Sequence, residues 1–252
     1  MHDADLSFLS SATNEDLKVL VDYITLGKSG SPRLTETLTG TDEYKRNYPY
    51  HLDRMTGSIT DELQRFGGNT FANILRGHGV PYKTILVDVC KKMKVSFNKN
   101  SSVEVIEGCL LQHVLIKTME EMSDEDMRNL LAELKIKTTG FGKQAMMAAV
   151  QGAIRFGGFA SYKIAVIVAN AVARALLGRG LSFAANAALT RWIGVFAGPI
   201  GWAITIAWTA LDIAGPAYRV TIPSVIQIAY MRVKANTPPQ LIETARTEET
   251  AE

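Results

Sequence analysis

The sequence predicts an all-α protein, with an N-terminal helical domain followed by an apolar, glycine- and alanine-rich helical hairpin region. One observation is the spacing of apolar residues, which recur every three or four positions, as in Leu17, Leu20, Val21 and Ile24. This is the period of an amphipathic helix. A second is the change near residue 140, where mixed-charge sequence gives way to Ala, Gly, Val and Ile. The 252 residues are enough to bury a sizeable core.

The first part of the chain is expected to contain a short helical module and a mixed-charge helical domain. Residues 1–30 form the module, in which Asn14 is the expected N-cap of a helix with acidic residues in its first turn. Residues 31–139 form the domain, which opens with a polar loop and a helix start at 42–58. Glycine, proline and serine signals then divide it into expected helices at 59–66, 69–75, 82–93, 103–122 and 124–136.

The second part is expected to be a basic, apolar helical region at 140–235, followed by a disordered tail at 236–252. Pro223 is expected in the first turn of the last helix, where a residue without an N–H group is tolerated. The tail is rich in Thr, Pro and Glu, which favours disorder. Glycine and proline divide the apolar region into helices at 146–177 (one helix, or two broken near 157–158), 181–192 and 222–234, with a strongly apolar, glycine-containing stretch at 193–213 between the last two.

Charge is distributed unevenly along the chain. Residues 1–139 hold 17 Lys and Arg against 20 Asp and Glu, whereas residues 140–235 hold 9 Lys and Arg and one acid, Asp212. A basic, apolar and acid-poor region suits an anionic partner, and anionic lipid is the natural candidate. No nucleic acid partner is expected, because the basic residues are spread among alanines and glycines rather than clustered.

The uncharged run at 192–211 is the most distinctive apolar feature. It is long enough to span a bilayer and holds all three tryptophans of the chain. Together with the preceding arginines it resembles a hairpin with a basic tip. Burial in a soluble helical domain, reversible membrane association and true insertion all remain open, because glycines, a proline and a central tryptophan also suit close packing. The candidate contacts with lipid or an apolar surface are Arg174, Arg179, Arg191, Trp192, Trp202 and Trp208.

A polar, glycine-flanked group is the candidate interaction site of the first part of the chain. Asn69, Asn73 and Arg76 are spaced by four and three residues, so they share one face of a helix. Arg76, followed closely by His78 between two glycines, is suited to hold a carboxylate or a phosphate. The alternative is that these side chains tie helix ends and loops together inside the domain.

The sequence offers no catalytic residues, no metal site and no cofactor site. The segment 27–29 (Gly-Lys-Ser) lacks the upstream glycine and the strand of a phosphate-binding loop. The four histidines and two cysteines have no metal-ligand spacing, and Cys90 is expected to be a buried thiol. The carboxylates at 104–133 are expected on a solvated face. Because no secretory signal or disulfide pattern is visible, we expect a cytoplasmic protein, with peripheral membrane association as an open alternative.

Several segments together resemble the YaaW family. They are 63–69, 76–82 and 85–90 in the first part of the chain, 215–223 and 225–229 near its end, and 3–9 with 14–17 at its start. The family is grouped, distantly, with ubiquinol–cytochrome c chaperones, which implies a helical fold. The stretch between residues 140 and 214 is similar mainly in character.

Within that family, the sequence is similar to sensors of two-component antiphage systems that act against nucleus-forming jumbo phages. The resemblance implies a non-enzymatic sensor or adaptor that recognises an early, membrane-associated stage of phage infection and recruits a partner effector. The expected partners are therefore that effector, and a phage component or anionic membrane lipid. Two alternatives remain open: a chaperone-like assembly factor that binds apolar protein segments, and a membrane-inserting, pore-forming effector. The oligomeric state is not predicted.

Overall fold

In the described part of the computed structural model, all regular secondary structure is helical, which confirms the all-α prediction. The described residues are 3–27, 31–33, 36–67, 79–120, 122–138, 140, 142–156, 158–177 and 217–242, and they contain no strand. Short 3₁₀ helices are η1 (Ala4–Ser11), η2 (Leu38–Gly40) and η3 (Leu52–Met55). The α-helices are α1 (Asn14–Thr25), α2 (Asp42–Asn47), α3 (Thr56–Phe66), α5 (Tyr82–Lys92), α6 (Val103–Glu120), α7 (Asp124–Glu133), α8 (Lys143–Phe156), α9 (Gly158–Leu177) and α12 (Tyr218–Ala235).

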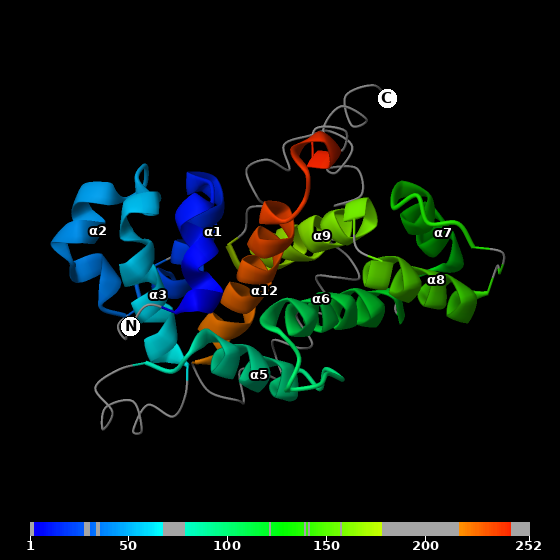
Figure 1. Ribbon diagram of the computed structural model, residues 1–252, viewed down its shortest axis with the longest axis horizontal. Coiled ribbons are helices and arrows are strands. Elements are labelled where there is room, and N and C mark those ends of the chain that lie inside the picture. Colours follow the sequence, from blue (N-terminus) through cyan, green and yellow to red (C-terminus); the bar gives the residue numbers. More distant parts are fainter. Residues whose placement is uncertain are drawn as a thin grey trace.

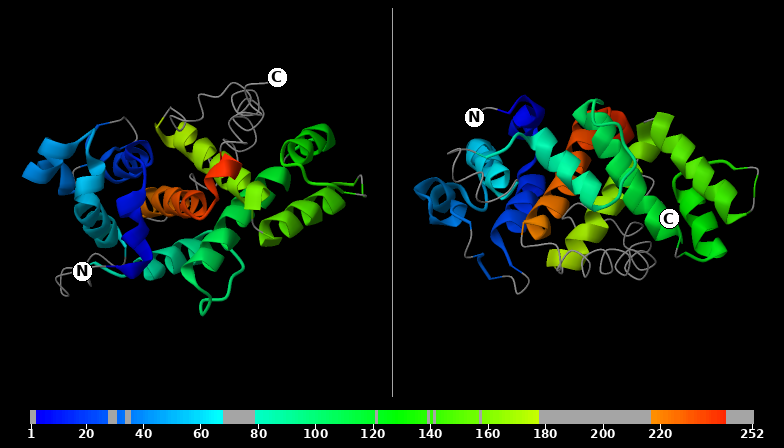
Figure 2. Two further views of the ribbon diagram at one scale, coloured as in Figure 1. Left: turned by 45° about the horizontal axis from the view of Figure 1, so that its top comes forward. Right: turned by 90° about the horizontal axis from the view of Figure 1, so that it is seen from below.

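Helix α12 lies at the centre of the molecule although it is the last long helix in the chain (Figures 1 and 2). It packs against α9, α1, α6 and α5, and every residue from Val220 to Arg232 is buried. Helices α2 and α3 lie toward one end of the molecule, and α7 and α8 toward the other. The core is therefore organised around a helix that meets partners from both halves of the chain.

The start of α12 differs from the prediction. The helix begins at Tyr218, four residues earlier than expected, so Pro223 lies inside it rather than in its first turn. Pro223 has no N–H group to donate to the carbonyl of Arg219, which normally costs helix stability. The fully buried side chains that follow, including Val225 and Ile228, show that tertiary packing outweighs this local penalty.

The N-cap of α1 is Thr13 rather than Asn14. Thr13 has an extended backbone, and its hydroxyl accepts a hydrogen bond from the Asp16 N–H at 3.4 Å. Asn14 is the first residue of the helix, and its amide side chain instead donates to the Pro49 carbonyl at 2.7 Å and accepts from the Leu52 N–H at 2.9 Å. The asparagine therefore ties α1 to a distant loop, which local capping rules do not anticipate.

The polar stretch at 42–58 contains more helix than predicted. Thr41 caps α2 by accepting a hydrogen bond from the Tyr44 N–H at 3.1 Å, and η3 follows before α3 begins. The rings of Tyr44 and Tyr48 stack with their centroids 4.7 Å apart. The sequence signal was present, because a threonine followed by Asp42 and Glu43 is a helix start.

The remaining boundaries follow the sequence closely. Ser123 caps α7 as expected, through a bond from the Asp126 N–H at 3.1 Å. The stretch predicted as one or two helices is two, α8 and α9, on either side of residue 157. In the stretch predicted as a disordered tail, residues 239–242 form a short helical turn, and Ile242 packs against the core.

Helix α9 is the one helix within the described ranges that is long and apolar enough to cross a membrane. The relevant window is Ala160–Leu177, of which 61% is buried inside the protein. It packs against α12 and α6. This is the pattern of a core helix, and length and composition alone are weak signs of a membrane span.

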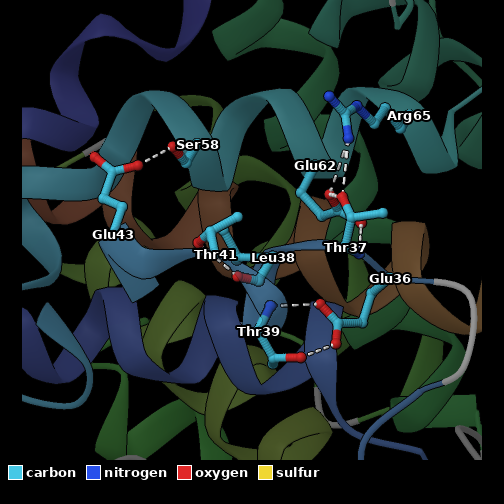
Figure 3. A network of polar contacts seen from close by, with 9 residues as sticks. All are labelled: Glu36, Thr37, Leu38, Thr39, Thr41, Glu43, Ser58, Glu62 and Arg65. Carbon is cyan, nitrogen blue, oxygen red and sulfur yellow. Dashed lines mark hydrogen bonds and ion pairs between the residues drawn. The ribbon is translucent and has the colours of Figure 1, made fainter. Parts of the chain in front are cut away.

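Carboxylates fasten the segment before α2 to the rest of the domain (Figure 3). Glu62, on α3, is buried and accepts hydrogen bonds from the Thr37 N–H at 2.9 Å and the Thr37 hydroxyl at 2.7 Å. Arg65 donates to the same hydroxyl at 2.9 Å. Glu36 accepts from Thr39, and Glu43 accepts from Ser58. These hydrogen bonds join residues 36–43 to one another and to α3, and each of these carboxylates already has a partner within the protein. We therefore assign them a structural role.

Candidate functional site

Most residues predicted to form sites lie outside the described ranges. The polar group Asn69, Asn73, Arg76 and His78 does so, and so do Arg179, Arg191, Trp192, Trp202 and Trp208. Arg174 is described. It lies in the last turn of α9 and is half-buried, and its Nε atom is buried without a hydrogen-bond partner. The proposed lipid and polar contacts therefore stay predictions.

The two ends of the segment that holds the polar group meet in space. The Val80 N–H donates to the Gln64 carbonyl at 3.2 Å, which joins the end of α3 to the approach of α5. Glycines make this contact possible. A Cβ atom on Gly67 would lie 2.3 Å from Ile85, and one on Gly79 would lie 2.5 Å from the Gln64 backbone. Both distances are shorter than carbon atoms tolerate, so these two glycines are required by close approach.

The end of α3, the middle of α5 and the start of α12 converge beside this junction (Figure 1). Side chains of these three helices line a cavity of about 280 Å³. Its wall brings together the two stretches, near residues 63–90 and 215–223, that carry the family resemblance. The sequence singled them out as two separate segments of the family resemblance and did not predict that they lie side by side. The lining residues are Phe66, Gly67, Ile85, Asp88, Ala217, Tyr218 and Thr221.

The polar side of this pocket is dominated by one carboxylate. Asp88 is 44% exposed, and the ammonium of Lys91 lies 4.0 Å from its carboxylate, an exposed and weak pair. Burial raises the pKa of the Tyr218 phenol, and the nearby Asp88 carboxylate raises it further. The Lys92 ammonium lies 5.5 Å from the centre of the Tyr218 ring. The pocket therefore combines apolar walls, an aromatic face and an accessible negative charge.

A second polar group is buried at the centre of the fold. Glu107 on α6 is 2% exposed, and it accepts hydrogen bonds from Arg232 Nε at 2.7 Å and from the Tyr82 hydroxyl at 2.7 Å. Arg232 Nη2 donates to the Asp5 carbonyl at 2.6 Å, and its guanidinium lies 4.3 Å from the Phe8 ring centre. Burial raises the pKa of Glu107, an effect that Arg232 and the Tyr82 hydroxyl oppose.

This buried pair corrects the expectation that the carboxylates at 104–133 are all solvated. The sequence did carry a signal for Glu107, since Val103 and Leu111 lie four residues away on either side of it and are both buried. A charged residue inside an apolar stripe needs a buried partner. The partner, Arg232, is 125 residues away, and sequence spacing could not identify it.

Two residues of α12 hold the start of the chain in place. Lys234 Nζ lies 2.6 Å from the Asp16 carboxylate, and Gln227 Nε2 donates to the Asp16 carbonyl at 3.1 Å. We call the two ion pairs, Arg232–Glu107 and Lys234–Asp16, the α12 clasp. Lys234–Asp16 connects α12 with α1, and Arg232–Glu107 connects it with α6 in the middle of the sequence. The hydrogen bond from Arg232 to the Asp5 carbonyl adds η1 to the clasp.

The clasp shows that some basic residues of the second half of the sequence are paired inside the protein. Arg232 and Lys234 each neutralise an acid from the first half. Lys163 is 8% exposed, and Lys143 donates to the carbonyls of Glu120 at 2.6 Å and Met122 at 3.0 Å, at the C-terminal end of α6. Part of the charge asymmetry that pointed to an external anion is therefore used inside the protein.

Loss of the Lys143 contact is expected to weaken the junction of α6 and α8. A cation at a helix C-terminus is favourable, and this one also satisfies two carbonyl groups. We expect Lys143→Met to lower the free energy of unfolding by about 1 kcal/mol in chemical denaturation, since the site is partly exposed. Lys137→Met, at an exposed position nearby, is the control. Equal effects of the two changes would contradict the assigned contact.

The two cysteines are expected to differ sharply in reactivity. Cys90 is fully buried, and burial raises its pKa to about 12, whereas Cys109 is half-buried. Because the thiolate is the reactive form, a thiol reagent at pH 8 should label Cys109 first and Cys90 slower by roughly three orders of magnitude. Mass spectrometry of native and denatured protein checks this. Equal labelling of both residues in the native protein would show that the core is open.

The fold and its polar groups define a class: an all-α protein in which an ion pair and hydrogen bonds fix the N-terminal module to a central, late helix, with a small pocket at the start of that helix. Among the described residues, no group of three or more His, Cys, Asp or Glu side chains is arranged to hold a metal ion.

Comparison with known proteins identifies the family. A UPF0174 protein of Helicobacter pylori strain J99 is 47% identical over 237 residues, covering 92% of each chain. Another, from strain 26695, is 41% identical over 206 residues, covering 80% of this chain and 98% of its own. YaaW of Escherichia coli K12, also a UPF0174 protein, is 31% identical over 236 residues, covering 92% of this chain and 94% of YaaW.

The chain therefore belongs to the UPF0174 family, which includes YaaW, and the predicted family resemblance is confirmed. Residues 1–34 also match a domain of unknown function, DUF3944. This match covers η1 and α1, the elements that the α12 clasp holds. No solved structure matches the chain.

Proposed function

We propose that this protein is a non-enzymatic sensor and adaptor of bacterial antiphage defence. It recognises an early, membrane-associated stage of phage infection and recruits a partner effector. The proposal rests on the similarity of the sequence to JukA-type sensors of two-component defence systems, and on a structural feature that suits sensing. We place it in the cytoplasm, with a phage component or anionic membrane lipid as the trigger and peripheral contact with the membrane.

The supporting structural observation is the α12 clasp. A sensor needs an element with two arrangements that its trigger favours unequally. Buried ion pairs suit such an element, because they are stable when fully paired and strongly unfavourable when one partner is lost. The clasp joins the start of the chain to its last long helix, and opening it would uncover the apolar faces of α1 and α12 for a partner.

Phage challenge in the native host tests the defence role. We expect deletion of the gene to raise the plating efficiency of a nucleus-forming jumbo phage and to leave that of a phage without a nucleus unchanged. Complementation should restore protection. Crosslinking before and after infection should capture an effector that associates during infection. Unchanged plating of both phages, or dye leakage and growth arrest on expression without phage, would contradict a sensor and favour another function.

Vesicle flotation tests the membrane part separately. We expect the intact protein to float with phosphatidylglycerol-containing vesicles at low salt and to be released as salt rises, since the attraction is electrostatic. Replacement of Arg174, Arg179 and Arg191 by Glu should abolish flotation. The matched control replaces three exposed basic residues of the first half, Arg54, Lys99 and Lys137, by Glu. Absence of flotation, or equal loss in both triple variants, would contradict lipid binding at these arginines.

A further inference from the structure

The pocket at the junction of α3, α5 and α12 is large enough to admit one long side chain. Its volume of about 280 Å³ lies just below the range of sites that enclose whole drug-sized ligands. Phe66 and Ile85 supply apolar walls, and the Tyr218 ring supplies an aromatic one. A long side chain with an apolar stem and a polar end fits this lining better than a small polar molecule does.

The polar atoms of the pocket are suited to bind a positively charged hydrogen-bond donor. Among the lining residues that lie in the described part of the chain, Asp88 is the one that is charged, and a carboxylate accepts hydrogen bonds. The hydroxyl of Thr221 donates to the Ala217 carbonyl at 3.2 Å, so its oxygen is left as an acceptor. The Tyr218 ring already has the Lys92 ammonium 5.5 Å from its centre, which shows that the ring is placed to attract a cation.

The neighbouring lysines favour a guanidinium over an ammonium ligand. Lys91 is itself an ammonium group and approaches Asp88 only to 4.0 Å, with 67% of its side chain exposed. A lysine side chain of a ligand would therefore form no better ion pair with Asp88 than Lys91 does. A guanidinium binds a carboxylate through two parallel hydrogen bonds and stacks on an aromatic ring, so it can displace an exposed and poorly formed pair.

We propose that this pocket binds an arginine side chain from a partner protein. The guanidinium contacts Asp88, and the aliphatic stem lies between Phe66 and Ile85. A protein is the source because, among the lining residues that the structure describes, none carries a positive charge that would neutralise the α-carboxylate of the free amino acid. This inference does not depend on the defence role proposed above, because any partner of the protein would supply the same chemistry.

NMR titration of the full-length protein with single-residue probes tests the inference. The probes are N-acetyl-arginine amide, the corresponding citrulline and lysine derivatives, free arginine and inorganic phosphate. We expect the arginine derivative to bind in the millimolar range with shifts at Ile85, Asp88 and Tyr218. The citrulline derivative, which has the same shape without the charge, should bind at least about tenfold more weakly.

Variants of the pocket sharpen the result. Asp88→Asn should weaken binding of the arginine derivative by about tenfold or more, whereas Asp53→Asn, at an exposed site on another element, should leave it unchanged. Lys91→Gln removes the competing ammonium and should strengthen binding a few-fold. Because Asp88 is partly exposed, these variants are expected to fold, and far-UV circular dichroism confirms that they have done so.

Several results would overturn the inference. Equal binding of the arginine and citrulline derivatives would show that charge is not recognised, and equal binding of the lysine derivative would exclude guanidinium selectivity. Tighter binding of free arginine would assign the pocket to a metabolite rather than a protein. Shifts with phosphate and none with arginine would show that Lys91 and Lys92, rather than Asp88, determine the ligand.

Discussion

Replacement of Arg232 by methionine is expected to lower the free energy of unfolding by about 3–5 kcal/mol. The change leaves the Glu107 carboxylate 2% exposed and without its cation, while the methionine keeps most of the apolar contact with Phe8. For a chain of this size, such a loss corresponds to a fall in melting temperature of roughly 6–20 °C. Urea denaturation and thermal melting of the purified protein measure it.

Two further variants separate the buried pair from general effects of charge. Glu104→Gln removes a carboxylate that is 53% exposed and 3.8 Å from Arg232, so we expect a change within about 0.5 kcal/mol. The double variant Glu107→Gln with Arg232→Met should recover most of the loss, because the glutamine oxygen still accepts from Tyr82 and no charge stays buried. If Arg232→Met alone lowers the free energy of unfolding no more than Glu104→Gln does, the Arg232–Glu107 pair is not formed.

Replacement of Gly79 by alanine should lower the free energy of unfolding by about 2–3 kcal/mol. The added Cβ would lie 2.5 Å from the Gln64 carbonyl carbon and 2.6 Å from its oxygen, and a backbone segment cannot move aside as a side chain tip can. The contact between the Val80 N–H and the Gln64 carbonyl should weaken with it. Chemical denaturation measures the loss, and hydrogen exchange at the Val80 amide reports the local opening.

Gly108 provides a control of opposite sign. It lies in the middle of α6, and a Cβ at that position meets nothing within 4 Å. Alanine is the better helix former, so Gly108→Ala should raise the stability by up to about 1 kcal/mol. Destabilisation by both changes would show that the effect at Gly79 is not a consequence of its close contact.

Local sequence patterns predicted where the helices lie, but they did not predict which helices contact each other. The apolar period and the cap and break signals located α1, α3, α5, α6 and α7 within a few residues of their observed bounds. The early start of α12 was missed because Pro223 signals a first turn, whereas burial on all sides stabilises the helix beyond it. Helix existence is a local property here, and its exact start depends on tertiary contacts.

The candidate site was predictable only in part. Both segments that line the pocket were singled out from the sequence, but their convergence depends on α12 crossing the ends of α3 and α5. The α12 clasp was not found, because Asp16 and Lys234 are separated by 218 residues and neither is unusual in its own helix. The sequence shows that the second half is basic. Only the structure shows that Arg232 and Lys234 of this half form ion pairs with acids of the first half.

The central position of α12 also constrains how this protein is made. During synthesis, the first 217 residues are translated before the helix around which they pack, so α1, α5, α6 and α9 cannot complete their core as they leave the ribosome. Contacts this distant in sequence slow folding and leave apolar surface exposed meanwhile. Folding of the nascent chain should therefore finish only near the end of translation, and a ribosome stalled before residue 218 should hold a chain that is protease-sensitive from its first helix onward.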